Sequence, residues 1–243
     1  MSAAVRWARR LIFLGAAAFA ALLLWAYGRK HPEDVPWTKL DLAQPVGAFT
    51  RAKLAGLHGE PARCRALLSR AGIRYTAMPR RLDGPQCGFS DGIRLEPGGA
   101  TTLAYRPEGL VTSCPVAAAL ALWEWHVVQP AALKRFGSRI VEVETFGSYN
   151  CRRMYGRATG DWSEHARANA VDVAGFRLAD GRRVSVAADW REAGPKGRFL
   201  HDVRDGACRL YTHTLSPDYN AAHRDHLHLD EAGRGVWGWH ACR

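Results

Sequence analysis

The sequence lacks several patterns that would place it in a common class. None of its six cysteines forms a C-x-x-C pair, which argues against zinc ribbons and thioredoxin-type redox motifs. No internal repeat occurs, and no low-complexity tract lies outside an alanine-rich N-terminal stretch. Acidic residues are few relative to basic ones, 23 against 34, so the formal net charge is +11. Such a charge indicates either a solvated basic surface or attraction to a polyanion such as nucleic acid, anionic lipid or a cell-envelope polymer.

The N-terminus combines basic residues with an apolar run. Arg6, Arg9 and Arg10 precede an uncharged run from Leu11 to Tyr27, which spans roughly 25 Å as a helix. A cleaved signal peptide is the alternative, but no clear Ala-x-Ala site follows the run. We therefore expect residues 1–30 to be a single-pass anchor in an inner membrane of bacterial type. The basic N-terminus would be cytoplasmic and the domain periplasmic, which excludes a nucleic-acid partner.

The segment after this run changes character. Residues 31–47 are rich in proline and polar side chains, which is typical of a linker. The globular domain is then expected at residues 48–243.

The cysteines fit an exported domain. An even number of scattered cysteines in such a chain predicts three disulfides, for which sequence allows fifteen connectivities. Sequential pairing would close three modest loops and is the expected arrangement. It joins Cys64 to Cys87, Cys114 to Cys151, and Cys208 to Cys242.

Local patterns predict a mixed fold. Helical spacing occurs over residues 52–73, with a break at 59–61, and again over 115–135 and 196–210. Strands are expected over 139–146, 170–178, 184–188 and 225–230, with short strands within 74–113. No regular βαβ rhythm appears, so the fold class is α+β: a small antiparallel sheet with flanking helices, preceded by one transmembrane helix.

Histidines and an aspartate form the most informative pattern. His165 lies seven residues before Asp172, where a turn could lead into a strand. Alternation within residues 225–230 places His226 and His228 on one face and two leucines on the other. A catalytic zinc needs three such ligands and an open position for water. Each histidine alone is more often structural, but the combination indicates a metal site.

The same residues carry a resemblance. The stretches concerned are SCP at 113–115, FGSYNCR at 146–152, SEHARANAVDVAGF at 163–176 and HRDHLHLD at 223–230. Over about residues 38–235 the chain resembles the bacterial extensin-like C-terminal domain family. It is similar, more distantly, to the zinc peptidase superfamily of lysostaphin-type enzymes, D-Ala-D-Ala metallopeptidases and the hedgehog domain. No hydroxyproline-rich wall repeat of the plant type is present.

The resemblance implies zinc bound by His165, Asp172 and His228. Two general bases are open: His226, which we favour, and Asp225, which would otherwise orient the histidine. His223 extends the histidine cluster and is a candidate for substrate binding. The remaining six histidines lack ligand spacing and are expected to be structural.

Three further residues are candidates around this site. Arg152 matches an arginine that steadies the substrate in related peptidases. Ser163 could bind substrate or, as we favour, cap the turn before the first ligand, and Trp162 could line a substrate groove. The chain also departs from related peptidases at Ala168, where glycine is usual, and at Trp162, where one branch has histidine. If the glycine position needs positive φ, Ala168 would be strained.

Two functions fit these features. The first is an anchored periplasmic zinc hydrolase that cuts peptide bonds of cell-wall peptidoglycan. The alternative is a non-catalytic wall-binding or signalling module that retains the metallopeptidase fold. Trp237 and Trp239 are expected to pack near the C-terminus rather than to bind sugar.

Overall fold

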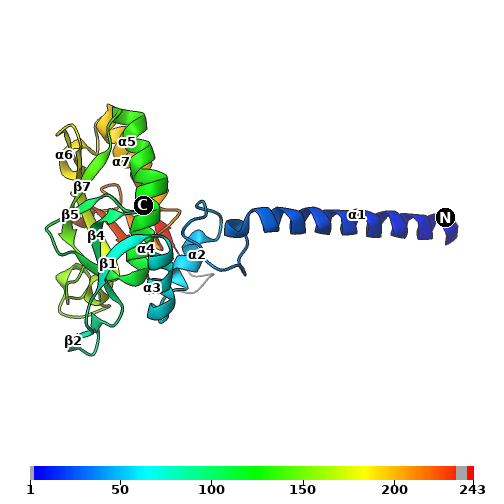
Figure 1. The fold of residues 1–243 in the computed structure, drawn as a ribbon, viewed down its shortest axis with the longest axis horizontal. Helices are drawn as coiled ribbons and strands as arrows, with labels where there is room; N and C mark the ends of the chain where they lie inside the picture. Colours follow the sequence, from blue (N-terminus) through cyan, green and yellow to red (C-terminus); the bar gives the residue numbers. More distant parts are fainter. Residues whose placement is uncertain (1–2, 234–239) are drawn as a thin grey trace.

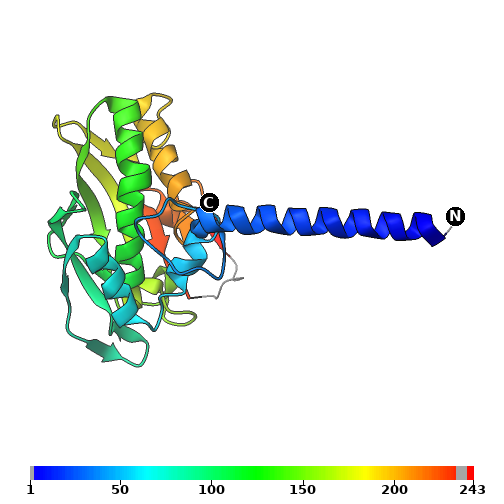
Figure 2. The same cartoon turned by 45° about the vertical axis from the view of Figure 1, so that its right-hand side comes forward.

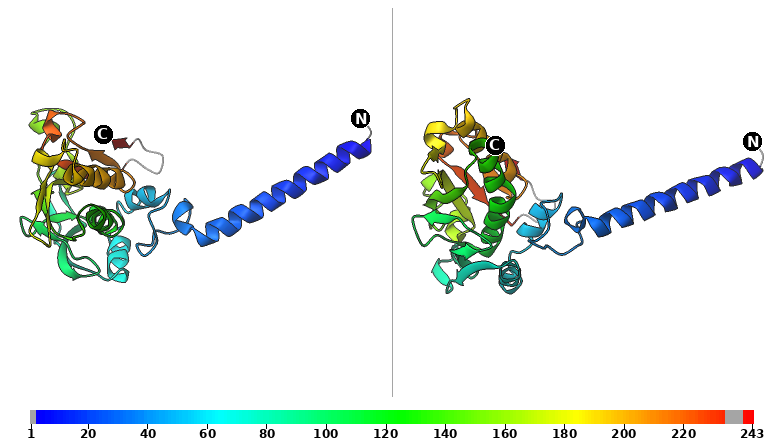
Figure 3. Two further views of the ribbon diagram at one scale, coloured as in Figure 1. Left: turned by 90° about the horizontal axis from the view of Figure 1, so that it is seen from above. Right: turned by 45° about the horizontal axis from the view of Figure 1, so that its top comes forward.

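The computed structural model describes residues 3–233 and 240–243, so Trp237 and Trp239 lie outside the described residues. Its first element, α1 (Ala3–Lys30), runs away from the folded domain in every view (Figures 1 and 3). None of the side chains in its most apolar window is buried, and α1 is long and apolar enough to cross a membrane. This is consistent with the single-pass helix expected from the sequence.

The segment after α1 is tied to the domain. It contains one short 3₁₀ turn, η1 (Pro32–Asp34). The Asp34 carboxylate accepts hydrogen bonds from Tyr27 Oη at 2.8 Å and from the backbone N–H of Ala48 at 2.7 Å. Leu40 and Leu42 are buried in the domain core. Residues 31–47 therefore have little regular structure, as a linker would, but two of their leucines pack as part of the domain.

A seven-stranded sheet forms the centre of the domain, in the order β12-β10-β11-β8-β7-β5, with β9 also paired to β8. The pairs from β10 through β11 and β8 to β7 are antiparallel, whereas β5 and β12 join the edges in parallel. The strands are β5 (Ala104–Arg106), β7 (Ile140–Gly147), β8 (Ala170–Leu178), β9 (Arg183–Ser185), β10 (His213–Leu215), β11 (Leu227–Asp230) and β12 (Ala241–Cys242). The expected antiparallel pairing is present among the central strands, whereas the parallel edge strands were not expected, and β11 is followed by the further short strand β12.

Shorter elements cover the N-terminal part of the domain. A three-stranded antiparallel sheet and a separate hairpin occupy the region where short strands were expected. The sheet consists of β1 (Ile73–Ala77), β4 (Gly92–Gly99) and β6 (Val111–Ser113), and the hairpin of β2 (Arg81–Gly84) and β3 (Cys87–Phe89). Two helices precede them, α2 (Thr50–Ala55) and α3 (Pro61–Arg70). Their separation matches the break expected at residues 59–61.

Two helical segments pack side by side against the sheet (Figure 2). The first runs through α4 (Cys114–Trp123), a π-helical turn η2 (Glu124–Val128) and α5 (Gln129–Phe136), where Gly137 at φ 66° ends it. Every residue of α4 is buried, which explains its apolar sequence. The second is α7 (Pro195–Ala207). Trp123 donates a hydrogen bond to the carbonyl of Val203 at 2.9 Å and so joins the two segments.

The strand expected over residues 184–188 is wrong beyond Ser185. The chain turns there into the short helix α6 (Val186–Asp189). The Asp189 carboxylate accepts a hydrogen bond from the Ser185 N–H at 2.8 Å, which satisfies a backbone donor at the start of the helical turn.

The cysteines form three disulfides, with Cα–Cα distances of 5.5 to 6.1 Å. They are Cys64–Cys114, Cys87–Cys151 and Cys208–Cys242. Sequential pairing is therefore correct for the last bridge and wrong for the first two. Short loop length did not decide the pairing, because α3 packs on α4 and β3 lies beside the chain that leaves β7. Cysteines in those neighbouring elements are the ones close enough to bond.

Candidate metal centre

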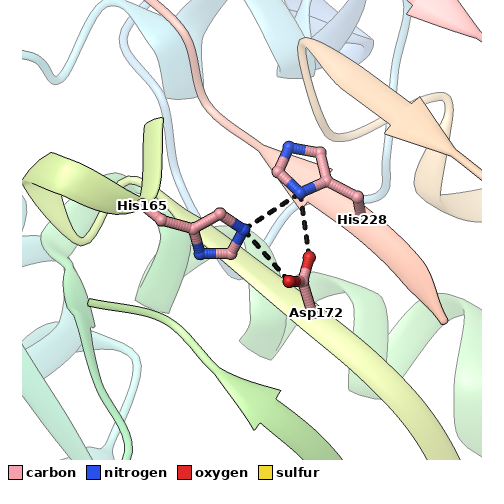
Figure 4. Close-up of side chains that lie close together, drawn as sticks. All are labelled: His165, Asp172 and His228. Carbon is pink, nitrogen blue, oxygen red and sulfur yellow. Dashed lines mark hydrogen bonds and ion pairs between the residues drawn. The ribbon is translucent and has the colours of Figure 1, made fainter. Parts of the chain in front are cut away.

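Three elements bring His165, Asp172 and His228 together (Figure 4). His165 lies in the 3₁₀ turn η4 (Glu164–Arg167), which Ser163 caps by accepting a hydrogen bond from the His165 N–H at 3.3 Å. Asp172 lies in β8, and His228 lies directly opposite it in β11. Directly opposed residues of an antiparallel pair point to the same face, so the register itself places the carboxylate beside the imidazole.

The three side chains converge through one nitrogen of each imidazole and the carboxylate of Asp172. His165 Nε2 lies 3.2 Å from His228 Nδ1 and 3.2 Å from Asp172 Oδ2. His228 Nδ1 lies 2.9 Å from Asp172 Oδ1. Tetrahedral zinc with bonds of about 2.0–2.1 Å places its ligand atoms about 3.3 Å apart. The spacing therefore suits a small tetrahedral ion with only slight outward movement of the ligands.

In each imidazole, the nitrogen that faces away from Asp172 donates a hydrogen bond to an oxygen of the protein. His165 Nδ1 donates a hydrogen bond to the carbonyl of Ser148 at 2.6 Å, and His228 Nε2 donates to Asp230 Oδ2 at 3.1 Å. Asp230 also accepts from His213 Nδ1 at 3.0 Å. These partners fix the ring orientations and direct the other nitrogen of each ring toward Asp172.

Sequence reasoning missed part of this support. Asp230 was not singled out, and His213 was expected only to be structural. Asp230 could have been found, because it continues the same alternation as His226 and His228. The backbone carbonyl of Ser148 carries no signal in the sequence at all.

Opposite charges within this cluster stabilise its ionised forms. Burial raises the pKa of Asp172, but its polar contacts with the His165 and His228 imidazoles outweigh burial and hold that pKa well below its ordinary value. Burial likewise lowers the pKa of His228, but hydrogen bonds to Asp172 and Asp230 raise it to about 10. Without a metal, His228 is therefore an imidazolium between two carboxylates at neutral pH. A bound cation would replace its proton.

His226 and Asp225 form a pair beside the three candidate ligands. His226 Nδ1 lies 2.9 Å from Asp225 Oδ1, and His226 Nε2 lies 3.6 Å from Asp172 Oδ1. The ring of Phe146 contacts His226 edge-on, with centroids 5.6 Å apart. The structure thus brings both expected general bases together, with the histidine toward the cluster and the carboxylate behind it.

His223 borders the other side of this pair. It ends the short turn η5 (Ala221–His223), and its Nδ1 lies 2.8 Å from Asn220 Oδ1. Its ring centroid lies 5.3 Å from that of His226 and 5.8 Å from that of His228. Burial, with help from these two histidines, lowers the pKa of His223 to about 4. His223 is therefore neutral at pH 7.

The chain segment that contains Arg152 runs alongside the first ligand. The carbonyl of Arg152 accepts a hydrogen bond from the Ser163 N–H at 3.1 Å, and the carbonyl of His165 accepts one from the Asn150 N–H at 3.0 Å. Within the described residues the Arg152 guanidinium has no hydrogen-bond or ion-pair partner. Trp162 is half-buried, with the guanidinium of Arg153 4.6 Å from its ring centroid.

Ala168 occupies the left-handed conformation that its position requires. Its φ is 54° and ψ 22°, and the residue is buried. Its carbonyl accepts hydrogen bonds from the Ser113 N–H at 2.6 Å and from Ser148 Oγ at 3.2 Å. The departure from glycine therefore carries backbone strain of about 1–2 kcal/mol. The surrounding hydrogen bonds hold the turn that carries His165.

Comparison with known families agrees with the resemblance seen in the sequence. The family model described as Extensin-like protein C-terminus matches residues 62–243, a stretch that contains every candidate site residue and all six cysteines. The chain therefore belongs to the extensin-like C-terminal family. No curated protein and no solved structure matches it.

Proposed function

We propose that this protein is a zinc-dependent hydrolase of peptide bonds in cell-wall peptidoglycan, anchored by α1 with its domain on the periplasmic side of an inner membrane. The observation that carries the proposal is the convergence of His165, Asp172 and His228 beside the Asp225–His226 pair. Three ligand atoms lie within 4.8 Å of one another, and a candidate base lies next to them.

The residues present fit zinc. Two imidazole nitrogens and one carboxylate oxygen form a donor set used in catalytic zinc sites, where a fourth position stays open. Ser148 and Asp230 hold the two rings in the tautomers that a metal needs. Zinc bound by these three residues would polarise a substrate carbonyl and lower the pKa of water.

The chain's own groups supply the proton transfer and the positioning. Asp225 accepts a hydrogen bond from His226 Nδ1, so His226 Nε2 carries the lone pair that takes a proton from the attacking water. The same nitrogen returns the proton to the amine that leaves. Arg152, whose guanidinium has no partner within the described residues, would bind a substrate carbonyl or carboxylate through that planar group. His223, neutral at pH 7, would hydrogen-bond the substrate without adding charge.

Features of the wider surface support a wall polymer as substrate. Three large rings near the histidine cluster are exposed: Phe146 beside His226, and Tyr155 and Tyr219 beside His223. Tyr155 belongs to the turn η3 (Met154–Gly156). Exposed rings beside a hydrolytic site suit an extended amphipathic chain. The net charge of +11 suits a polymer that carries carboxylates.

The test is zinc content and muropeptide hydrolysis by the full chain in detergent micelles, next to Asp172→Ala and a control, Asp205→Ala. Asp205 is exposed, and in the described part of the chain its one ion pair is with the neighbouring Arg204. We expect about one zinc per chain and hydrolysis in the wild type and the control, and neither in Asp172→Ala. Zinc without hydrolysis of any muropeptide would favour the non-catalytic wall-binding or signalling module. A folded wild type that takes up no zinc on titration would refute the metal site.

A further inference from the structure

A groove of about 490 Å³ adjoins the candidate metal centre. It lies between the β2–β3 hairpin, the loop that follows β5 and the end of β7, and we call it the Tyr149 groove. Ser148 lines the groove, and its carbonyl accepts the hydrogen bond from His165. Gly147 also lines it and is paired with Asp172 across β7 and β8. The groove is therefore one residue away from two of the candidate ligands, a separation that an extended substrate held at the metal centre would span.

One wall of the Tyr149 groove is built before any ligand binds. Tyr149 Oη donates a hydrogen bond to Asp83 Oδ2 at 2.6 Å, and the same carboxylate oxygen lies 2.6 Å from Arg81 Nε. The Arg81 guanidinium lies 4.3 Å from the centroid of the Tyr149 ring, and the Phe89 ring meets that ring edge-on. These contacts hold the aromatic surface in one position, so little conformational entropy is lost when a ligand packs against it.

A disulfide fixes this wall relative to the catalytic residues. Cys87 begins β3, and its partner Cys151 immediately precedes Arg152. The hairpin therefore cannot move away from the chain segment that runs beside His165.

The Tyr149 groove carries one uncompensated positive charge. Arg80 lines it and, within the described residues, has no hydrogen-bond or ion-pair partner. The charged groups around it are already paired, Asp83 with Arg81 and Glu108 with Arg106. The rest of the lining is largely apolar, including Leu110 and Val111.

We propose that the Tyr149 groove binds the part of the peptide substrate next to the scissile bond, and that this part carries a free carboxylate. Arg80 would bind the carboxylate through two parallel N–H donors. The aliphatic part of the substrate residue that carries this carboxylate would pack on Tyr149 and Phe89. This inference rests on the proposed hydrolase function, and it adds a substrate requirement at one subsite. Amidation of the carboxylate would remove the charge and one acceptor oxygen.

The experiment compares two synthetic stem peptides that differ only in a carboxylate or a carboxamide beside the scissile bond. Each is tested with the zinc-loaded full chain in micelles, with Arg80→Gln, and with the control Arg191→Gln. Arg191 is exposed, has no partner within the described residues, and follows α6 at the opposite end of the domain from β2 (Figure 1). Because Arg80 is exposed and has no partner among the residues that the structure describes, its replacement should leave folding intact.

We expect kcat/KM to favour the carboxylate peptide by about tenfold in the wild type and in Arg191→Gln, with the preference lost in Arg80→Gln. Dissociation constants measured with the metal-free Asp172→Ala chain should show the same Arg80 dependence without any turnover. A wild type that hydrolyses both peptides equally, or an Arg80→Gln variant that keeps the preference, would overturn the inference. If neither peptide is cut but the carboxylate peptide binds in an Arg80-dependent way, the groove assignment holds and the hydrolase function fails.

Discussion

Zinc binding to the metal-free protein should release a proton from His228. This imidazole lies 2.9 Å from Asp172 and 3.1 Å from Asp230. Burial lowers its pKa, and the two carboxylates raise it to about 10. At pH 8 nearly every metal-free chain therefore carries the proton on the nitrogen that zinc needs. Each zinc bound at that pH should release about one proton.

The size of the effect follows from the shifted pKa. Below about pH 10 the apparent zinc affinity should rise about tenfold per pH unit, or about 1.4 kcal/mol, because each zinc competes with one proton. Stability shows the opposite trend in the metal-free protein. The folded-state pKa lies above the unfolded value of about 6.5, so the contribution of His228 is complete below pH 6.5 and is lost as the pH rises through 10.

Isothermal titration of zinc into the full chain in micelles, in two buffers of different ionisation enthalpy, measures the protons released. The control is Asp230→Asn, which removes one carboxylate from His228 and should lower its pKa, so that fewer protons leave at pH 8. A zinc affinity that is independent of pH between 6.5 and 9, with no proton release, would show that His228 and Asp172 do not form the ligand pair inferred here.

Three other changes test separate parts of the structure. His226→Ala should keep its zinc but lower kcat for muropeptide hydrolysis by about 10²–10⁴-fold, because the proton acceptor is lost; an unchanged kcat would leave Asp225 as the base. Replacing Cys87 and Cys151 together by alanine should lower the free energy of unfolding by about 4 kcal/mol, since the bridge spans a sequence separation of 64. Denaturation with guanidinium measures this loss, and a stability within 1 kcal/mol of the wild type would contradict it. Leu42→Ala should cost about 2–5 kcal/mol, because the side chain is 1% exposed. The same denaturation assay should show little change for Trp37→Ala in the same segment, where the ring is 85% exposed, and equal losses for the two variants would argue that residues 31–47 do not pack as described.

Local periodicity was sufficient where one pattern governed a whole element. The apolar stretch after Pro115 predicted the buried helix α4, and the strand pattern in residues 170–178 predicted β8, because each pattern continues over the whole length of its element. The prediction failed at Val186, where the apolar alternation suggested a strand. Asp189 instead bonds to the Ser185 N–H and starts a helical turn.

The candidate site likewise contains residues that the sequence could identify and residues that only the structure reveals. His165, Asp172 and His228 could be selected from residue type, spacing and the family resemblance. The left-handed turn at Ala168 could also be anticipated, because related peptidases have glycine there. The alternation of His226 and His228 also points to Asp230, although its hydrogen bond to His228 is seen only in the structure. The role of Ser148 could not be anticipated, since it depends on a backbone carbonyl.

Composition and local pattern thus determined the apolar helix α1, the mixed fold class and the chemical types of the candidate ligands. Each of these depends on residues close together in the chain. Tertiary structure alone decided that Cys64 bonds to Cys114 and Cys87 to Cys151, and that the Tyr149 groove adjoins His165. The two bridges join cysteines that are 50 and 64 residues apart in sequence. Cys64 and Cys114 meet because α3 packs on α4, and Cys87 and Cys151 meet because β3 lies beside the chain that leaves β7.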